Sequence, residues 1–572
     1  MVNVTAPGTA PSTSSGSSDR ASIASAPTEY TSTLPGAYRS STTSLGRRRS
    51  LLHIRAGRDP AHPPRAWYQR LLPHFSSYTG PYPVGVYDFE WESALAPDSA
   101  LRAQFGDALV TDVQSLLVRV FYPADPEVVA PELEAEVATY GHHLPQGHEG
   151  TPYKRPKWLG NYEGVGYGDF IRMPKWISKA TFGAMFCTAR LPAYENAPVL
   201  APGPVDAAHV LPHVHEPPPT AAPIPPVPAQ FPVIIFSHGL GGTKGTYSYV
   251  CGELASRGAV VVAIEHRDGS ASRSVERQQV EHAYQRIGVT GEENRVLRIN
   301  QVHHRVVEVR AALALVRQWA RGESPANQLD DKMHPWRALA GRMDLGQMMM
   351  AGHSFGGGTS VAVLQQQRAD REAGMNHGDA QMDFKAGYVM DPWLFAVDKK
   401  KGVDVPLLSA STETFHWPHN VEAMHDIYAL SKQYQSPQCP DPVVTTIGTA
   451  HQNHSDFVML VGKGLLGKAK MAGPMDPVRA LQLHTAMAAS FMTRCGIPLA
   501  APEYYGLLQD PHAVNPEHVG FAPEAADDED SKDDLRQVVN DVLDEDQTHP
   551  DVVLGWAWYK EKFDVPSPFS ES

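Results

Sequence analysis

The sequence predicts an α/β protein built on a doubly wound, mostly parallel sheet. From Phe231 onward, short runs rich in Val, Ile, Leu and Met alternate with longer amphipathic segments. The short runs are apolar throughout, as in strands that are buried on both faces of a parallel sheet. One of them leads directly into GHSFG at residues 352–356, a motif typical of a sharp strand-to-helix turn. In sheets of this kind, functional sites lie at the carboxyl ends of the strands.

Each predicted element follows from its own local pattern. The expected strands are rich in β-branched and aromatic residues and end at turn residues. They are PVGVYDFEWE, SLLVRVFYPAD, FPVIIFSHG, AVVVAIEHRDG, GQMMMAGHS, KAGYVMDPWLF, VPLLSASTE and VVTTIGTAHQNH. The expected helices carry apolar residues along one face or lie between two strands. They are YSYVCGELASRG, QVHHRVVEVRAALALVRQWA and GGTSVAVLQQQ.

Composition divides the 572 residues into three parts. Residues 1–65 are rich in Ser, Thr, Pro, Gly and Ala, so we expect a disordered tail. Residues 66–520 are expected to form the α/β domain, with a Pro- and Ala-rich surface insertion at about 195–230. Residues 521–572 contain the run DDEDSKDD and are expected to form an acidic C-terminal extension.

Charge and cysteine content argue against several classes of function. The formal net charge of −14 argues against a nucleic-acid partner, because nucleic acids are themselves negatively charged. Four scattered cysteines without CxxC spacing predict neither a disulfide framework nor a zinc site. With no apolar run of membrane-spanning length and no secretory signal, we expect a cytoplasmic protein, although the Ser- and Thr-rich start leaves a mitochondrial presequence open. The sequence does not indicate an oligomeric state.

Ser354 in the GHSFG motif is the candidate nucleophile. A nucleophilic serine of this type stands on a tight turn in a strained backbone conformation, and glycines on both sides let the strand and helix approach closely. The alternative is an ordinary glycine-rich turn. The apolar run GQMMMA before the motif and the helical pattern GGTSVAVLQQQ after it favour the nucleophile.

A serine nucleophile needs a base, and the base needs an orienting acid. In this fold class the acid and then the histidine follow the serine along the chain. Asp391 directly follows an expected strand, which places it at the carboxyl edge of the sheet, and Glu413 follows the next strand and remains the second candidate. His451 lies in a loop after a strand and is favoured as the base over its neighbour His454.

The glycine-rich stretch FSHGLGG after the strand at residues 231–236 is a candidate oxyanion-binding loop. An oxyanion hole needs two backbone N–H groups, one from the residue after the nucleophile and one from the loop after an earlier strand. We therefore expect the amides of Phe355 and Leu240 to bind the oxyanion. An ordinary strand-to-helix turn is the alternative interpretation of this loop.

Several longer stretches resemble one family of enzymes. The segments ASRGAVVVAIEHRDGSAS and HQNHSDF, together with FSHGLGG, GHSFGGGTS and DPWLF, are similar to the platelet-activating-factor acetylhydrolases of the plasma and type II group. These are calcium-independent, phospholipase A2-type serine esterases with an α/β-hydrolase fold. The resemblance spans roughly Gly80 to Pro498, with gaps, and does not cover the tails or the Pro-rich insertion.

The resemblance implies a catalytic triad of Ser354, Asp391 and His451, with oxyanion donors Leu240 and Phe355. It implies a phospholipid substrate with a short or oxidised sn-2 acyl chain, and neither a metal nor an organic cofactor. This sequence departs from the family pattern at two positions, Pro392 and His454, where alanine and an aromatic residue are expected. Both departures put the shape of the acyl pocket in doubt more than the chemistry.

Two segments are candidates for peripheral contact with a membrane surface. MPKWISKATFGAMF carries Trp176, Ile177 and Phe182 between lysines, and MLVGKGLLGKAKM carries Leu465 and Leu466 between lysines. An apolar face edged with lysine fits a membrane interface, and it equally fits a helix that packs on the core. The sequence does not decide between the two.

The sequence leaves two rival functions open. A general carboxylesterase or a neutral-lipid lipase would use the same triad and differ in its pocket alone. A catalytically inactive hydrolase-fold scaffold would use its tails to recruit partners, and the complete set of candidate catalytic residues argues against it. A panel of phospholipid, triglyceride and short soluble esters distinguishes the phospholipid esterase from the first rival. An active-site serine probe that fails to label the protein would favour the second.

Overall fold

The structure is a computed structural model of the 572-residue chain. It describes residues 75–92, 113, 115–125, 154–183, 186, 188–204, 226–276, 280–286, 291–323, 325–329, 335–437, 442–461, 463–468, 470–500 and 552–554. The expected tail at residues 1–65, the centre of the Pro-rich insertion and most of the acidic extension lie outside these residues. Among the described residues, no helix is both long and apolar enough to cross a bilayer.

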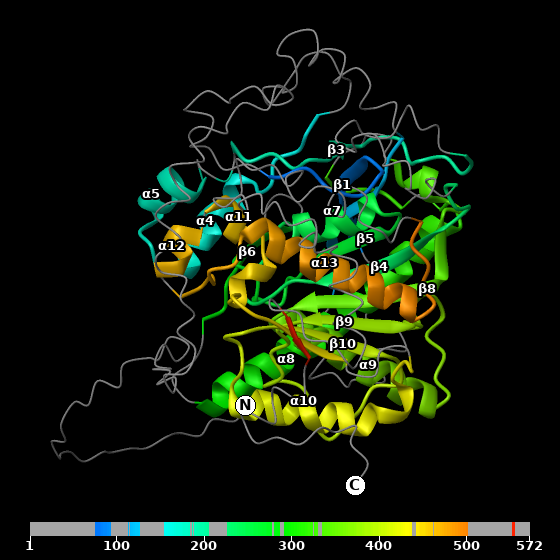
Figure 1. Ribbon diagram of the computed structural model, residues 1–572. Coiled ribbons are helices and arrows are strands. Elements are labelled where there is room, and N and C mark those ends of the chain that lie inside the picture. Colours follow the sequence, from blue (N-terminus) through cyan, green and yellow to red (C-terminus); the bar gives the residue numbers. More distant parts are fainter. Residues whose placement is uncertain are drawn as a thin grey trace, which may run out of the picture.

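One large mixed sheet organises the described part of the chain (Figure 1). Its strand order is β12-β11-β10-β9-β8-β4-β5-β2-β1-β3. The strands are β1 (Val84–Glu92), β2 (Ser115–Pro123), β3 (Tyr194–Glu195), β4 (Phe231–Ser237), β5 (Val260–Glu265), β8 (Met343–His353), β9 (Ala386–Met390), β10 (Leu407–Thr412), β11 (Val443–Thr446) and β12 (Val552–Leu554). A separate hairpin contains β6 (Arg273–Glu276) and β7 (Val280–Ala283).

The centre of the sheet is parallel and doubly wound, as the sequence predicts. Strands β5, β4, β8, β9, β10 and β11 run parallel to their neighbours, whereas β2 and β12 pair antiparallel at the two ends of this set. Strand β4 lies between β5, which follows it along the chain, and β8, which comes later. The winding therefore changes direction between β4 and β8, and ligand sites form outside the carboxyl ends of strands at such a point.

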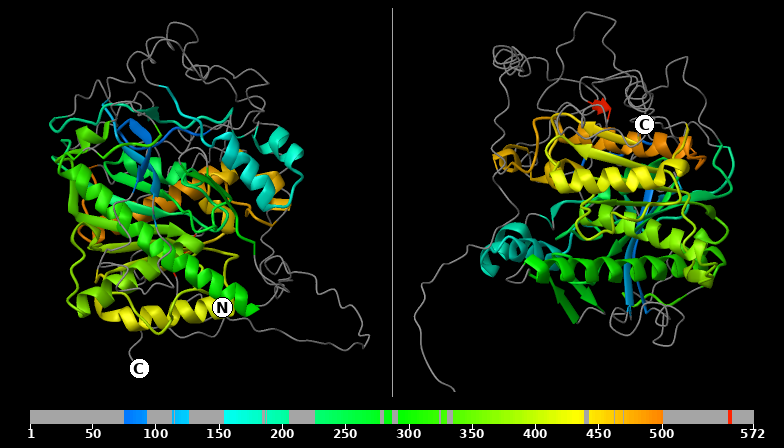
Figure 2. Two further views of the ribbon diagram at one scale, coloured as in Figure 1. Left: turned by 180° about the vertical axis from the view of Figure 1, so that it is seen from behind. Right: turned by 90° about the horizontal axis from the view of Figure 1, so that it is seen from below.

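Helices cover both faces of the sheet. They are α4 (Asn161–Phe170), α5 (Lys175–Ser178), α7 (Ser248–Ser256), α8 (Gly291–Ala320), α9 (Phe355–Glu372), α10 (Pro418–Ser431), α11 (Phe457–Leu460), α12 (Lys463–Lys468) and α13 (Pro477–Arg494). Residues of α7 and α13 belong to one buried cluster, and residues of α8, α9 and α10 belong to the other. Figure 1 shows α13 in front of the sheet, and the view from behind in Figure 2 brings α8 to the front.

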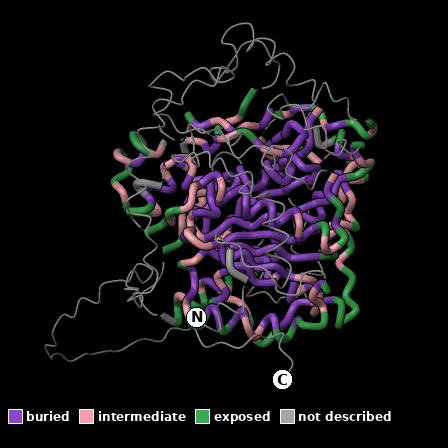
Figure 3. The backbone as a smooth tube through the Cα atoms, viewed as in Figure 1, coloured by how far each residue is buried: buried purple, intermediate pink, exposed green. Residues whose placement is uncertain are grey.

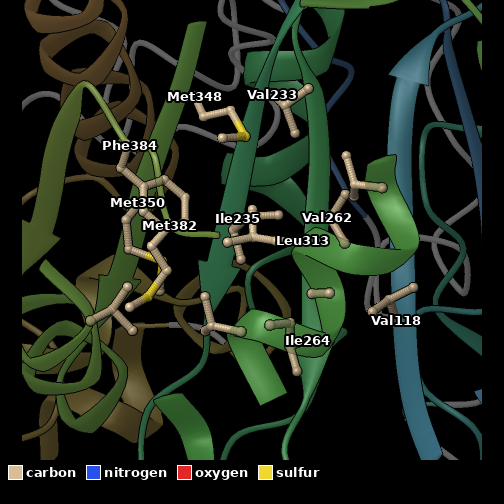
Figure 4. Packing of buried hydrophobic residues seen from close by; sticks show 14 of the residues in the cluster. Val118, Val233, Ile235, Val262, Ile264, Leu313, Met348, Met350, Met382 and Phe384 are labelled. Carbon is tan, nitrogen blue, oxygen red and sulfur yellow. The ribbon is translucent and has the colours of Figure 1, made fainter. Parts of the chain in front are cut away.

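Successive side chains of a central strand point to opposite faces of the sheet, and here the side chains on both faces are apolar. In β4, Val233 and Ile235 face the cluster on α8, whereas Ile234 and Phe236 face the cluster on α7 and α13. Figure 4 shows Val233 and Ile235 packed with side chains of β5, β8 and α8. The purple centre of Figure 3 marks the same two-sided burial. A continuous apolar run is thus the signature of a strand with no solvent-exposed face.

Two places differ from the sequence-based expectation. The segment expected to be a surface insertion begins inside the fold, since Ala197 and Leu200 are buried and the Tyr122 hydroxyl donates a 2.6 Å hydrogen bond to the Ala197 carbonyl. Strand β12 pairs with β11 although it lies in the segment expected to be an acidic extension. Short apolar stretches inside biased composition explain both differences, because composition averages over such stretches.

Candidate active site

The carboxyl ends of neighbouring strands lie level with one another, and this brings the candidate residues together. Ser237 at the end of β4 is in register with Gly352 of β8, and His353 at the end of β8 is in register with Met390 of β9. The residues that follow these ends therefore emerge at one edge of the sheet. They include Ser354, which its GHSFG motif selects, and Asp391, which was selected because it directly follows an expected strand.

Ser354 occupies the strained turn that its motif predicts. Its backbone has φ 57° and ψ −120°, between the end of β8 and the start of α9. A positive φ is costly for a residue with a Cβ and is found where surrounding contacts enforce it. Here the Ser354 N–H donates to the Met390 carbonyl at 2.9 Å, and the Ser354 carbonyl accepts from the Trp393 amide at 2.8 Å. The turn is also tightly packed, since a Cβ added to Gly356 would lie 2.0 Å from the carbonyl oxygen of Ser237. Glycine at this position lets α9 pass next to β4.

The three residues of the expected triad are connected by hydrogen bonds. His451 Nε2 lies 2.9 Å from Ser354 Oγ, and His451 Nδ1 lies 3.0 Å from Asp391 Oδ2. In the arrangement that suits a base, Nδ1–H donates to the carboxylate and Nε2 accepts from the serine hydroxyl. The Asp391 side chain is fully buried, whereas the His451 side chain is 27% exposed, so the histidine and serine are open to an incoming ligand.

Thr412 holds the acid in place and was missed by sequence reasoning. Its backbone N–H donates to Asp391 Oδ1 and its hydroxyl donates to Asp391 Oδ2, both at 2.7 Å. Burial alone would raise the pKa of the Asp391 carboxyl, but the neighbouring His454 and the hydrogen bond from His451 hold this pKa well below its usual value. The carboxylate thus stays ionised inside the protein. Thr412 ends β10, the strand beside β9, and this pairing is not visible in the sequence.

The loop that carries His451 is also held from several sides. Phe415 stacks on the His451 ring with a centroid distance of 4.1 Å and an interplanar angle of 10°. The side-chain oxygen of Asn453 accepts hydrogen bonds from the backbone of Ala450 and Gly473. Glu413, the second candidate for the acid, instead accepts a 2.8 Å hydrogen bond from the Gly448 amide. It therefore supports the loop and does not contact the histidine in the way that Asp391 does.

The expected oxyanion-binding amides lie next to the nucleophile. A Cβ added to Gly239 would be 3.1 Å from the Cβ of Ser354, so the loop backbone passes directly beside the serine. The Gly239 amide donates to the Tyr247 hydroxyl, and the Gly241 amide donates to the Ser270 carbonyl. No acceptor among the described residues binds the Leu240 or the Phe355 N–H. Both amides are therefore available to a ligand oxygen.

Three further histidines surround the acid. Burial lowers the pKa of His353, His454 and His484. His454 Nε2 lies 3.7 Å from Asp391 Oδ2 and does not bond to Ser354, so it does not replace His451. His454, where the family pattern leads one to expect an aromatic residue, thus adds a second imidazole next to the acid and not next to the nucleophile.

One group of side chains in the described part of the chain has the donor spacing of a metal site. It consists of His353, Asp391 and His454, whose ligand atoms lie within 4.8 Å of one another. The Asp391 carboxylate already accepts hydrogen bonds from Thr412 and faces His451 Nδ1. A cation bound here would compete with the histidine for the same oxygen, so we treat the group as part of the hydrogen-bonded site.

The residues expected at a membrane surface are placed differently from one another. Trp176 is 75% exposed on α5, while Ile177 and Phe182 are half-buried. Leu466 is buried and belongs to the core, so the expectation of a surface role is wrong for this residue. The reason is local: α12 turns its leucine inward onto the cluster that contains α11 and α13. The side chain of Leu465 lies outside the described residues.

Comparison with known proteins places the chain in a family. Residues 203–497, just over half of the chain, match the family described as platelet-activating factor acetylhydrolase, isoform II. The chain belongs to this family. Ser354, Asp391, His451 and the loop that carries Leu240 all lie within the matched residues. The resemblance inferred from the quoted motifs is therefore confirmed, together with the α/β-hydrolase class.

Individual relatives agree with this assignment. A platelet-activating factor acetylhydrolase of Gallus gallus is 31% identical over 284 residues, which cover 46% of this chain and 62% of the relative. A putative phospholipase A2 of Schizosaccharomyces pombe is 25% identical over 451 residues, which cover 73% of this chain and 91% of the relative. The chain spans about six tenths of the length of the acetylhydrolases that it matches.

A solved structure is also similar at low sequence identity. It is a ferulic acid esterase from Streptomyces cinnamoneus, with 16% identity and a TM-score of 0.44. The similarity covers 78% of this chain and 98% of the esterase.

Proposed function

We propose that this protein is a serine esterase that hydrolyses the short or oxidised sn-2 acyl ester of glycerophospholipids. The single observation that carries the proposal is the continuous hydrogen-bonded path from Ser354 through His451 to the buried Asp391. The relatives named as platelet-activating factor acetylhydrolase and putative phospholipase A2 support the substrate class.

In the proposed reaction, His451 takes the proton of the Ser354 hydroxyl as Oγ attacks the ester carbonyl carbon. Asp391 stabilises the imidazolium that forms and keeps the ring in the required tautomer. The amides of Leu240 and Phe355 stabilise the negative oxygen of the tetrahedral intermediate. His451 then protonates the departing lysophospholipid alkoxide, which leaves an acyl group on Ser354.

Release of the acyl group reverses the same steps with water as the nucleophile. His451 accepts a proton from water, the hydroxide attacks the acyl carbonyl, and the proton returns to Ser354 as the carboxylic acid leaves. Every proton is carried by His451, and every charge is balanced by Asp391 or by backbone amides. The mechanism uses side chains and backbone alone, so we expect activity without calcium.

Contact with a membrane surface is proposed through the exposed apolar side chains on and around α4 and α5. These are Tyr162, Ile171 and Trp176, which are 54%, 55% and 75% exposed. Exposed aromatic and aliphatic residues beside Lys175 and Lys179 suit the interfacial region of an anionic bilayer. Replacing Trp176 with Ser should reduce co-sedimentation with anionic liposomes.

The matched control for this test is Leu430→Ser, since Leu430 is 46% exposed on α10. Figure 1 shows α10 along the lower edge of the fold and α5 at its upper left. Equal binding by the two variants would contradict the proposed contact surface.

The function itself is tested by hydrolysis of a 2-acetyl glycerophosphocholine, with wild type and Ser354→Ala measured side by side and a chelator present. We expect release of acetate by the wild type alone, at a rate that the chelator does not change. Serine-dependent cleavage of a short soluble ester without cleavage of the phospholipid would contradict the substrate and retain the triad. Absence of both activities would contradict the proposal as a whole.

A further inference from the structure

Helix α8 carries a buried arginine to the loop that follows β4. The side chain of Arg305 is 0% exposed, and its Nη1 donates a 2.6 Å hydrogen bond to the carbonyl oxygen of His238. The same nitrogen lies 3.3 Å from the hydroxyl of Ser237, the last residue of β4. One side chain thus holds the backbone at the point where the strand passes into the candidate oxyanion-binding loop.

The same guanidinium also packs against the ring of Phe355, whose backbone amide is the second candidate oxyanion donor. The guanidinium carbon of Arg305 lies 4.6 Å from the centroid of the Phe355 ring. A cation over an aromatic face is a favourable contact, and it is stronger when both groups are removed from water. Phe355 is fully buried and is the first residue of α9, directly after Ser354. Arg305 therefore contacts the two segments that supply the two amides.

Hydrogen bonds fix the peptide groups of the loop one after another. The His238 carbonyl, held by Arg305, belongs to the same planar peptide as the Gly239 N–H, which donates to the Tyr247 hydroxyl at 3.2 Å. The Gly239 carbonyl belongs to the next peptide and accepts a 3.0 Å hydrogen bond from the Gly242 amide. The N–H of that second peptide is the one that belongs to Leu240, so its direction depends on both anchors.

Two polar side chains fix the guanidinium itself. Arg305 Nε donates to Asp268 Oδ2 at 2.9 Å, and Nη2 donates to Ser270 Oγ at 2.6 Å. The Ser270 carbonyl in turn accepts a 2.7 Å hydrogen bond from the Gly241 amide of the loop. Asp268 is 1% exposed and balances the buried charge of the arginine. The planar guanidinium of an arginine donates to these partners in a fixed geometry. A lysine ammonium is a compact point charge that lacks this geometry.

We propose that Arg305 is a positioning residue that holds both halves of the oxyanion hole, the Leu240 amide through His238 and the Phe355 amide through its ring. This assignment rests on the proposed function and names a residue that the triad and its motifs do not include. Arg305 does not touch the substrate. Its effect is to keep both amides aimed at the position that the oxyanion occupies in the transition state.

Helix α8 supplies a matched control for the test. Arg310 is also fully buried on α8 and pairs with the buried Asp370, and its Nη1 donates to the Ala380 carbonyl at 3.2 Å. Arg305→Lys and Arg310→Lys therefore remove comparable buried guanidinium groups, and of the two only Arg305 contacts the loop and Phe355. Full-length variants are compared in thermal stability, in kcat and KM for a short-chain ester, and in affinity for an alkyl trifluoromethyl ketone.

The ketone is the decisive probe because it forms a tetrahedral adduct with the serine and places an oxyanion in the hole. For Arg305→Lys we expect kcat and ketone affinity to fall together by roughly 10²-fold, with KM changed by less than about threefold. Arg310→Lys should lose comparable thermal stability and keep both quantities within about threefold of wild type. Equal losses of ketone affinity in the two variants would overturn the assignment.

A milder pair of variants keeps the test decisive if Arg305→Lys does not fold. Ser270→Ala removes one partner of the guanidinium and should lower ketone affinity by about fivefold. Ser274→Ala removes a buried hydroxyl that has no hydrogen-bond partner among the described residues, and it should change nothing. Equal affinity in the two serine variants would overturn the assignment. A wild-type protein that cleaves no ester and reacts with no serine probe would overturn the proposed function first, and this assignment with it.

Discussion

Two carboxyl groups at the same edge of the sheet show how their surroundings decide their charge. Asp391 follows β9 and Glu265 ends β5, and both are almost completely buried. The pKa of Asp391 lies well below its usual value, whereas burial and the nearby Glu163 carboxylate raise the pKa of Glu265 to about 7. Burial is therefore not what distinguishes them.

The difference lies in the neighbouring groups, because His454 and the hydrogen bond from His451 lower the pKa of Asp391. Asp391 receives a donor on each oxygen from Thr412 and a further one from His451. Glu265 Oε2 accepts one hydrogen bond from the Lys244 amide, and its Oε1 has no partner among the described residues. The carboxylate that accepts more hydrogen bonds from the protein is therefore Asp391, which faces the histidine of the candidate triad. The groups around each carboxyl, and not its burial, thus set the two pKa values apart.

The largest expected effect comes from removing the charge of Asp391. Asp391→Asn should lower kcat/KM by about 10⁴-fold, because the amide cannot hold the His451 ring in the tautomer that accepts the serine proton. The control is Asp404→Asn, since Asp404 precedes its strand and pairs with Arg371 away from the triad. Steady-state hydrolysis of a soluble ester measures both variants. A loss in Asp391→Asn no larger than in the control would contradict the role of the acid.

A smaller effect is expected from removing one donor and keeping the carboxylate. Thr412→Val deletes the hydroxyl that bonds to Asp391 Oδ2, so the pKa of Asp391 should rise and kcat/KM should fall by about tenfold at acidic pH. A profile of kcat/KM from pH 4 to 8 should show the acid limb shifted upward. The matched control is Thr445→Val on β11, because the Thr445 hydroxyl has no partner among the described residues. Superimposable profiles for the two variants would show that the Thr412 hydroxyl does not tune the acid.

The smallest effect concerns stability and not activity. Because folding raises the pKa of Glu265 from about 4.5 to about 7, its contribution to stability is complete below pH 4.5 and is lost as the pH rises to 7. Asp391 has the opposite sign, since its contribution is present above the usual carboxyl pKa and is lost below it. Glu265→Gln should therefore remove a decline on the order of 3 kcal/mol in the free energy of unfolding between these pH values.

Urea unfolding at several pH values between 4.5 and 7 measures this decline. The exposed Glu422 provides the control as Glu422→Gln, which should follow the wild-type curve. A Glu265→Gln variant that follows the same curve would mean that Glu265 is ionised throughout this range.

Features that depend on neighbours along the chain could be predicted from the sequence. The turn at Ser354, the position of Asp391 after a strand and the loop of His451 all follow from local patterns, and the structure brings the three residues together. The central strands also follow from their apolar runs. Strand β12 was not predicted, because three residues within a segment of biased composition give too short a pattern.

Features that depend on neighbours across the sheet could not be predicted. Thr412 holds Asp391 because β10 lies beside β9, and Arg305 reaches the His238 carbonyl because α8 packs on the face of the sheet that Val233 and Ile235 of β4 line. Neither contact has a fixed spacing along the chain. Leu466 was a candidate for membrane contact and is instead buried in the core. A lysine-edged apolar pattern fits a surface helix as well as one that packs on the core, so the sequence alone could not distinguish the two.

The most direct measurement of the central claim is chemical capture of the acyl-enzyme. Purified protein is mixed with 2-acetyl glycerophosphocholine, quenched in acid within the first turnover and digested for mass spectrometry. The account predicts an acetyl group on the peptide that contains Ser354, and none on the corresponding peptide of Ser354→Ala. Acetate release without an adduct on Ser354, or an adduct on another residue, would contradict it.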